Sequence, residues 1–310
     1  MATGSMRPVS VIVFPGGFNW PIWVAQQNGY FAKGGIAVEL TPTPNSVFQL
    51  TNLIDGKFDI AMTAIDNVIA YMEGQGEGKT ERNPDLIVFM GGDNGFLSLA
   101  GSADIKSIAD LKGRTVSVDA LTTGYAFVLL DLLKRGGLTR DDYRIEKSGG
   151  VLERWGALKE KKHDATMLIT PFDIFARMAG LKVLQYAIDV YGHYQGLVGA
   201  ARREWAVRNP DVVQAYIRGY IAGVDFLRVP ANRGAAIAIL RKHLPQMPEE
   251  VAQQCYAAMT GSAGFTPKAE LDVEGVRRVL ALRSEYGAPK KAMTDPLKYY
   301  VPDYYAAATR

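Results

Sequence analysis

The sequence has little of the side-chain chemistry that builds covalent or metal-bound sites. It contains one cysteine, Cys255, and three histidines in 310 residues. A single cysteine excludes a disulfide within the chain and any cysteine-rich metal site. Because His163, His193 and His243 stand far apart in the sequence, a zinc site of histidine and cysteine ligands is not predicted either. We therefore expect no metal and no cofactor.

Long apolar runs and stripes of one charge are also missing. No stretch approaches the ~20 apolar residues that span a membrane. The start of the chain lacks the basic segment followed by an apolar segment that is typical of a signal peptide. The formal net charge is only +3, and no basic stripe indicates a nucleic-acid partner. The length suits two lobes of ordinary size.

Short apolar segments alternate with helical segments through the first two thirds of the chain. Residues 8–14, 36–40 and 86–90 are typical strands, and segments of helical period lie between them. This alternation predicts parallel βαβ units throughout. From residue 209 onward, four segments of helical period follow one another without a strand. We therefore expect an α/β protein with a helical C-terminal extension.

One loop between a predicted strand and helix is a candidate binding segment. Residues 113–118 form a β-branched strand, residues 126–135 have helical period, and Thr122, Thr123 and Gly124 lie between them. Either threonine can cap the helix, whose free N–H groups favour an anionic or polar group. The carboxyl ends of parallel strands are where open α/β sheets bind ligands. The alternative is a cap with a purely structural role.

Several motifs, in a fixed order, resemble one group of solute receptors. Residues 27–40 read QNGYFAKGGIAVEL and residues 53–61 read LIDGKFDIA; residues 107–118, 163–165 and 209–213 continue the pattern. In this order they are similar to the type II periplasmic solute-binding proteins of ABC transporters. That group serves nitrate, sulfonates, taurine and thiamine pyrimidine precursors. The resemblance covers about residues 8–228.

The resemblance implies two doubly wound α/β lobes joined by a two-segment hinge, with the ligand held between them. Lobe 1 would comprise residues 8–92 and 196–310, and lobe 2 would comprise residues 98–190. The hinge segments would lie near residues 92–98 and 190–196. Glycines occur in both segments and can absorb hinge rotation.

In such a receptor the loops at strand ends line the cleft, which gives a list of candidate ligand-binding residues. They are Phe18, Asn19, Trp20, Asn45, Ser46, Ala64, Asp66, Asn67, Gly92, Asn94, Thr122, Thr123, Gly124, Tyr125, Thr170, Pro171, His193 and Tyr194. Helix N-termini that converge on one cleft suit a compact anion without an arginine. Arg154 is expected on the surface of lobe 2, so no arginine is predicted in the cleft.

Three of these candidates have an alternative structural role. Trp20 either lines the cleft or belongs to the core. Asp66 either caps its helix or faces the ligand, and in the second case it favours a ligand with an amine or ring N–H donor. His193 is either a structural histidine or a ligand contact. The aromatic residues nearby favour a ring or alkyl portion on the ligand over a simple inorganic anion.

The resemblance implies a non-catalytic receptor that binds a small organic molecule, anionic or aromatic and heterocyclic, and delivers it to an ABC permease. A monomer located in the periplasm, or anchored by lipid outside the cytoplasm, is the corresponding expectation. The alternative is an enzyme on the same scaffold, similar to desulfinases and decarboxylases or to pyrimidine synthases. A desulfinase would require a cysteine in the cleft, and Cys255 lies in a late helical segment where we expect it to be buried.

Overall fold

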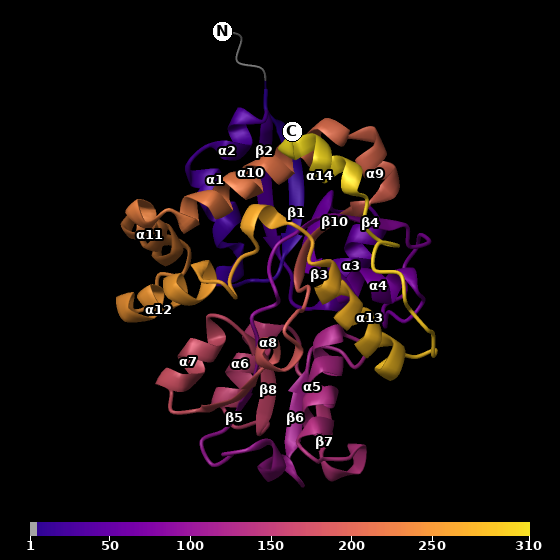
Figure 1. Cartoon of the computed structure of the whole chain (residues 1–310), viewed down its shortest axis with the longest axis vertical. Helices are drawn as coiled ribbons and strands as arrows, with labels where there is room; N and C mark the ends of the chain where they lie inside the picture. Colours follow the sequence, from indigo (N-terminus) through magenta and orange to yellow (C-terminus); the bar gives the residue numbers. More distant parts are fainter. Residues whose placement is uncertain (1–4) are drawn as a thin grey trace.

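The computed structural model describes residues 5–310. The first four residues lie outside the described part, so the prediction about a signal peptide at the start of the chain is not addressed by it. Two five-stranded sheets stand one above the other in Figure 1 and belong to two α/β lobes. The upper lobe, here called lobe 1, contains the first strand, and the lower lobe is called lobe 2. The predicted fold class, two α/β lobes connected twice with a helical C-terminal extension, is confirmed.

The sheet of lobe 1 has the order β2-β1-β3-β10-β4. Its strands are β1 (Arg7–Val13), β2 (Ile36–Pro42), β3 (Ile60–Ala64), β4 (Leu86–Gly91) and β10 (Leu197–Arg202). The sheet of lobe 2 has the order β7-β6-β8-β5-β9. Its strands are β5 (Leu97–Gly101), β6 (Thr115–Val118), β7 (Arg144–Lys147), β8 (Ala165–Ile169) and β9 (Lys182–Tyr186).

The expectation that all strands are parallel is wrong for one strand in each sheet. Strand β10 is antiparallel to β3 and β4, and β5 is antiparallel to β8 and β9. Each of them is the first strand after the chain crosses from the other lobe. A strand that enters in this way needs no crossover helix, so it is free to pair antiparallel.

Among residues 5–310, four α-helices accompany each sheet and six follow the last strand. Lobe 1 has α1 (Trp20–Gln27), α2 (Tyr30–Lys33), α3 (Ser46–Ile54) and α4 (Ile65–Met72). Lobe 2 has α5 (Gly124–Arg135), α6 (Val151–Lys159), α7 (Phe172–Met178) and α8 (Ala187–Tyr191). The extension contains α9 (Arg203–Arg208), α10 (Pro210–Arg228), α11 (Arg233–His243), α12 (Glu249–Thr260), α13 (Val273–Tyr286) and α14 (Pro302–Thr309). Within residues 5–310, none of these helices has the length and apolar character needed to cross a membrane.

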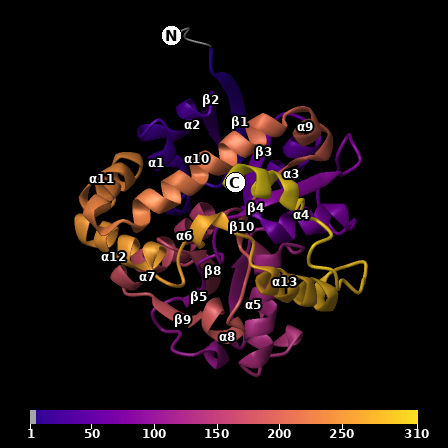
Figure 2. The same ribbon diagram turned by 45° about the horizontal axis from the view of Figure 1, so that its top comes forward.

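The long helix α10 runs across lobe 1 and covers α1 and α2 (Figure 2). Its buried face includes Tyr216, Tyr220 and Gly223. A side chain at Gly223 would place its Cβ 2.1 Å from the carbonyl oxygen of Pro21 in α1. The close approach of the two helices therefore depends on a residue without a side chain at this position.

The two segments that connect the lobes lie side by side. The N–H of Gly196 donates to the carbonyl oxygen of Asp93 at 2.9 Å. A Cβ at Gly196 would lie 2.1 Å from the nitrogen of Gly95, so the two backbones are in direct contact. The side chain of Asp93 strengthens this contact, because its Oδ1 accepts the N–H groups of both Gly95 (2.7 Å) and Leu197 (3.1 Å).

We predict that Gly223→Ala destabilises the protein by about 1–3 kcal/mol, because the new methyl group meets rigid backbone of α1. Thermal unfolding measures the effect. The matched control is Gly234→Ala in α11, where an added Cβ has no neighbour within 4 Å. That variant should be unchanged or more stable by up to about 1 kcal/mol. Equal melting temperatures for the two variants would contradict the packing described for α10.

Candidate functional site

A cavity lies between the two lobes, beside the connecting segments. Its empty volume is about 600 Å³, a figure that includes space open to solvent. Both sheets and the first connecting segment contribute to its wall. The lining residues are Phe14, Phe18, Ala64, Asn67, Asp93, Gly95, Asp119, Thr123, Gly124, Tyr125, Val151, Arg154, Ile169 and Leu197.

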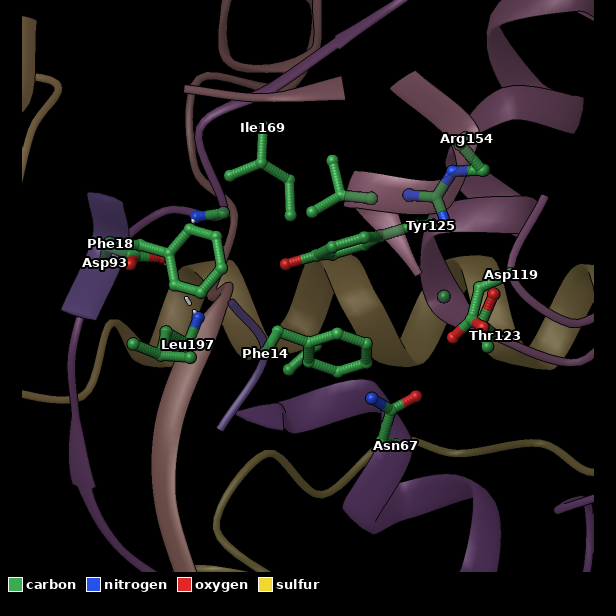
Figure 3. A pocket seen from close by; sticks show the side chains of 14 residues that line it. Phe14, Phe18, Asn67, Asp93, Asp119, Thr123, Tyr125, Arg154, Ile169 and Leu197 are labelled. Atoms are coloured by element: carbon green, nitrogen blue, oxygen red, sulfur yellow. Dashed lines mark hydrogen bonds between the residues drawn. The ribbon is translucent and has the colours of Figure 1, made fainter. Parts of the chain in front are cut away.

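The middle of the cavity is apolar and aromatic. In Figure 3 the rings of Phe14, Phe18 and Tyr125 and the side chain of Ile169 surround the central space. Burial raises the pKa of the Tyr125 hydroxyl, so this group stays protonated at neutral pH. Aromatic walls of this kind bind flat rings or alkyl groups through their large contact area.

Arg154 of α6 provides a buried guanidinium at one end of the cavity (Figure 3). Its Nη1 donates to the carbonyl oxygen of Gly149 at 2.7 Å, while Nε and Nη2 donate to that of Met167 at 3.4 and 3.2 Å. A guanidinium has five N–H groups, so two have no hydrogen-bond partner in residues 5–310. Burial lowers the pKa of Arg154, although an arginine remains charged at neutral pH.

Asp119 lies at the same end of the cavity, in the loop between β6 and α5 (Figure 3). Its Oδ2 accepts the N–H of Ser46, at the N-terminus of α3 in lobe 1, at 3.0 Å. A carboxylate is favourable there because a helix N-terminus carries a partial positive charge. Its Oδ1 is buried and has no hydrogen-bond partner among residues 5–310. This oxygen is available to accept a hydrogen bond from a ligand.

Asp93 lies at the opposite end of the cavity, near Phe18 and Leu197 (Figure 3). It is 2% exposed, and no cation pairs with it within the described part of the chain. Burial raises the pKa of this carboxyl to about 6, against the lowering effect of the N–H groups of Leu197 and Gly95. A ligand group that donates a hydrogen bond would offset the cost of this buried charge.

The model of a known family matches residues 19–230 of the chain, and its description is NMT1/THI5 like. The chain belongs to the NMT1/THI5-like family. A curated relative is the 4-amino-5-hydroxymethyl-2-methylpyrimidine phosphate synthase of Schizosaccharomyces pombe, 22% identical over 282 residues, or 81% of this chain and 74% of the relative.

Solved structures show the same fold at low sequence identity. The ligand-binding component of an ABC-type import system from Staphylococcus aureus has a TM-score of 0.77 at 15% identity, with 97% of this chain and 99% of that chain covered. The periplasmic aliphatic sulphonate-binding protein of Escherichia coli has a TM-score of 0.71 at 18% identity, with 96% and 92% covered. The family member described here therefore has the fold of periplasmic binding proteins.

In this NMT1/THI5-like chain, some of the residues proposed from sequence line the cavity and others do not. Those that line it are Phe18, Ala64, Asn67, Thr123, Gly124 and Tyr125. Thr123 directly precedes α5, but its side chain does not cap the helix. Its hydroxyl instead donates to the carbonyl oxygen of Ala120 at 3.0 Å. The expected threonine cap is therefore wrong, although the first turn of α5 does open onto the cavity.

The placement of Trp20 in the cleft is wrong. Its side chain is fully buried in lobe 1, its Nε1 donates to the carbonyl oxygen of Ala236 at 3.0 Å, and its ring meets the edge of Tyr256. The adjacent Asn19 turns back to the carbonyl oxygen of Phe14 at 2.7 Å. Trp20 thus holds the start of α1 against the extension, Asn19 holds it against the loop after β1, and neither is among the lining residues.

Asn45, Ser46 and Asp66 also serve other contacts. Asn45 caps α3 by accepting the N–H of Phe48 at 2.7 Å, and Ser46 meets Asp119 through its backbone. Asp66 forms a buried ion pair with Arg283 at 2.6 Å. The expectation that the Asp66 carboxylate faces the ligand is therefore wrong, and Asp93 and Asp119 are the carboxylates of the cavity.

The remaining candidates are not among the residues that line the cavity. The backbone N–H of Thr122 donates a hydrogen bond to the carboxylate of Glu77, and the side chain of Asn94 donates to the carbonyl oxygen of Ala263. His193 is exposed and lies 3.0 Å from Asp272. Tyr194 is buried, with its ring centroid 6.4 Å from that of Tyr125. Neighbouring residues bury the other three candidates, which are Gly92, Thr170 and Pro171.

Of the three charged residues of the cavity, the sequence interpretation placed Asp93 at the first crossing between the lobes and did not assign Arg154 or Asp119 to the site. Arg154 was expected on the surface, but three donated hydrogen bonds hold it inside. Asp119 directly follows β6, at the carboxyl end of a strand, which was a usable signal. Asp93 lies two residues after the end of β4, within the expected hinge segment. The absence of a cleft arginine is therefore a wrong expectation.

We predict that Asp93→Asn changes how stability depends on pH. Because burial raises the pKa of this carboxyl to about 6, the native protein binds the proton more tightly than the unfolded chain. Asp93 therefore lowers stability as pH rises from about 4 to 6, and the loss is complete above that range. The stability of the variant relative to the native protein should increase by about 2 kcal/mol from pH 4 to pH 7.

Urea unfolding at both pH values measures this difference. The control is Asp141→Asn, which removes an exposed carboxylate. An Asp93→Asn variant with the same relative stability at both pH values would show that the carboxyl is not destabilised by burial.

Proposed function

We propose that this protein is a non-catalytic receptor that binds a small organic molecule in the cavity and delivers it to an ABC permease. The observation that supports the proposal is a set of hydrogen-bonding groups without partners in an otherwise largely apolar cavity between the lobes. Two N–H groups of Arg154 and Oδ1 of Asp119 have no partner in residues 5–310. A buried polar group without a partner costs about 1–3 kcal/mol, and a bound ligand would remove that cost.

The charges of the cavity favour a particular class of ligand. Two carboxylates, Asp93 and Asp119, face the space together with one guanidinium, that of Arg154. This balance disfavours a simple inorganic anion. It favours a neutral or zwitterionic molecule with a ring or alkyl body, acceptor atoms at the Arg154 end and an N–H donor at the Asp93 end.

The names of similar proteins agree with a small organic ligand that has an alkyl or ring body, and they do not identify it or its charge. One solved neighbour is named as binding aliphatic sulphonates, another as the ligand-binding component of an importer, and the curated relative is named for an aminopyrimidine phosphate. By this resemblance we further propose a monomer that acts outside the cytoplasm or is anchored there by lipid.

The second candidate is an enzyme on the same fold, which the name of the curated synthase favours. Thiolate chemistry in the cavity receives no support from Cys255. That residue is fully buried in α12, is not among the lining residues, and has its thiol pKa raised by burial to about 12. His163, His193 and His243 are not lining residues either.

A thermal-shift screen of the purified chain tests the receptor. The probes are alkyl and aryl sulfonates, taurine, aromatic acids, aminopyrimidines and nitrate. A ligand at about 100 times its dissociation constant stabilises by ~2.7 kcal/mol. We expect one class of organic molecule to raise the melting temperature and to return unchanged in mass spectrometry. Chemical conversion of that molecule would favour the enzyme instead.

We predict that Arg154→Met weakens binding of the compound found in the screen by about 10-fold to 100-fold, because a hydrogen bond to a charged group contributes about 1.5–3 kcal/mol. Isothermal titration calorimetry measures the affinity. The control, Arg241→Met, changes an exposed arginine of α11 and should leave affinity unchanged. A folded Arg154→Met variant with native affinity would remove this end of the cavity from the binding site.

A further inference from the structure

Arg283 of α13 lies at the point where the C-terminal extension meets both lobes. We propose that it is a positioning residue that holds the lobes closed and fixes the wall of the cavity formed by residues 123–125. This role goes beyond the proposed receptor function, since it concerns closure of the molecule whether or not a ligand is carried or converted. The hydrogen bonds of Arg283 and its contact with Phe127 support this proposal.

The first set of contacts ties Arg283 to lobe 1. Its side chain is fully buried, and its Nε and Nη2 donate to Oδ1 and Oδ2 of Asp66, both at 2.6 Å. Its Nη1 donates to Oε1 of Gln75 at 2.8 Å. A two-fold pairing of guanidinium and carboxylate has fixed geometry as well as strength. The position of the guanidinium is therefore set by α4 and the loop that follows it.

The second set of contacts reaches lobe 2. Nη2 of Arg283 also donates to the carbonyl oxygen of Thr122 at 2.5 Å. The guanidinium carbon lies 4.8 Å from the ring centroid of Phe127 in α5, within the range of a cation–π contact. One side chain thus joins α13 and α4 to the start of α5 across the space between the lobes.

The segment held in this way is part of the cavity wall. Thr122 is followed by Thr123, Gly124 and Tyr125, all of which line the cavity. The carboxylate of Asp66 packs directly against Gly124, because a Cβ there would lie 2.4 Å from its Cγ. A shift of the Asp66–Arg283 pair must therefore move this segment and the aromatic ring of Tyr125 with it.

The course of α13 supports a role in closure. Figures 1 and 2 show the helix beside α5 of lobe 2, although the chain reaches it from lobe 1, and it contacts both α4 and α5. An exposed ion pair, Lys134 of α5 with Glu285 of α13 at 2.7 Å, joins the same two helices. Exposed pairs of this kind contribute little, so the buried contacts of Arg283 dominate.

The arrangement also allows the lobes to separate. Breaking a buried ion pair would leave an uncompensated charge, which is strongly unfavourable. Asp66 and Gln75 belong to the same side of the contact as α13, so both can stay with Arg283 when lobe 2 moves. Among the contacts of Arg283, opening then breaks one hydrogen bond to Thr122 and the contact with Phe127, and the charge of Arg283 stays paired.

Distances between spin labels on the two lobes test the proposal without any ligand. The labels are placed on Lys57→Cys in lobe 1 and Lys182→Cys in lobe 2, both exposed positions, while Cys255 is fully buried. The test variant is Asp66→Asn with Arg283→Met, which removes both charges together. We expect a larger population of long interlobe distances than in the native chain, and a smaller increase for Arg283→Lys, which keeps the charge but loses the planar fork.

The matched control removes an exposed pair on the same helix, Glu274→Ala with Arg277→Ala, and should leave the distances unchanged. If the double variant at Asp66 and Arg283 fails to fold, Phe127→Leu replaces it, because it removes only the ring under the guanidinium and should shift the distances in the same direction. Native distances in the folded test variant, or in Phe127→Leu where that variant replaces it, would overturn the proposal. Since no ligand is used, this result is independent of the binding screen.

Discussion

The arrangement of the molecule depends on the hydrogen bonds that the Asp93 carboxylate accepts where the chain passes between the lobes. Its Oδ1 binds the N–H groups of Gly95 in one connecting segment and Leu197 at the end of the other. Because the group is buried, its charge is costly, and its pKa is raised to about 6. The same carboxyl lines the cavity. The connection between the lobes and the proposed binding site therefore share one charged group, so a ligand that hydrogen-bonds to Asp93 would act directly on this connection.

Two buried arginines illustrate the difference between a structural charge and one that is available to a ligand. Arg283 is paired with the Asp66 carboxylate and also meets Gln75 and Thr122, so its donors are well used. Arg154 bonds only to backbone carbonyl groups, and no carboxylate of residues 5–310 lies within 4.0 Å of it. Two of its N–H groups have no partner and its charge is not paired among residues 5–310. These properties are the basis of the proposed ligand contact.

Much of the fold followed from sequence patterns, whereas the charged part of the site did not. The alternation of strands and helices and the ordered motifs predicted two α/β lobes, but no local pattern shows that β5 and β10 enter their sheets antiparallel. The loop before α5 was recognised because a strand, two threonines and a glycine precede a helix. Trp20 and Arg154 were misplaced for a common reason: their partners, the carbonyl groups of Ala236, Gly149 and Met167, are backbone groups that any residue offers. Such pairings arise only from tertiary packing.

A crystal structure of the protein with the compound found by screening would test the central claim most directly. The account predicts an unconverted molecule between the lobes, with acceptor atoms within hydrogen-bond distance of Arg154 and a donor group on Asp93. Its ring or alkyl body would pack among Phe14, Phe18 and Tyr125. A ligand bound elsewhere, or one that leaves both charged ends of the cavity without contacts, would contradict the account.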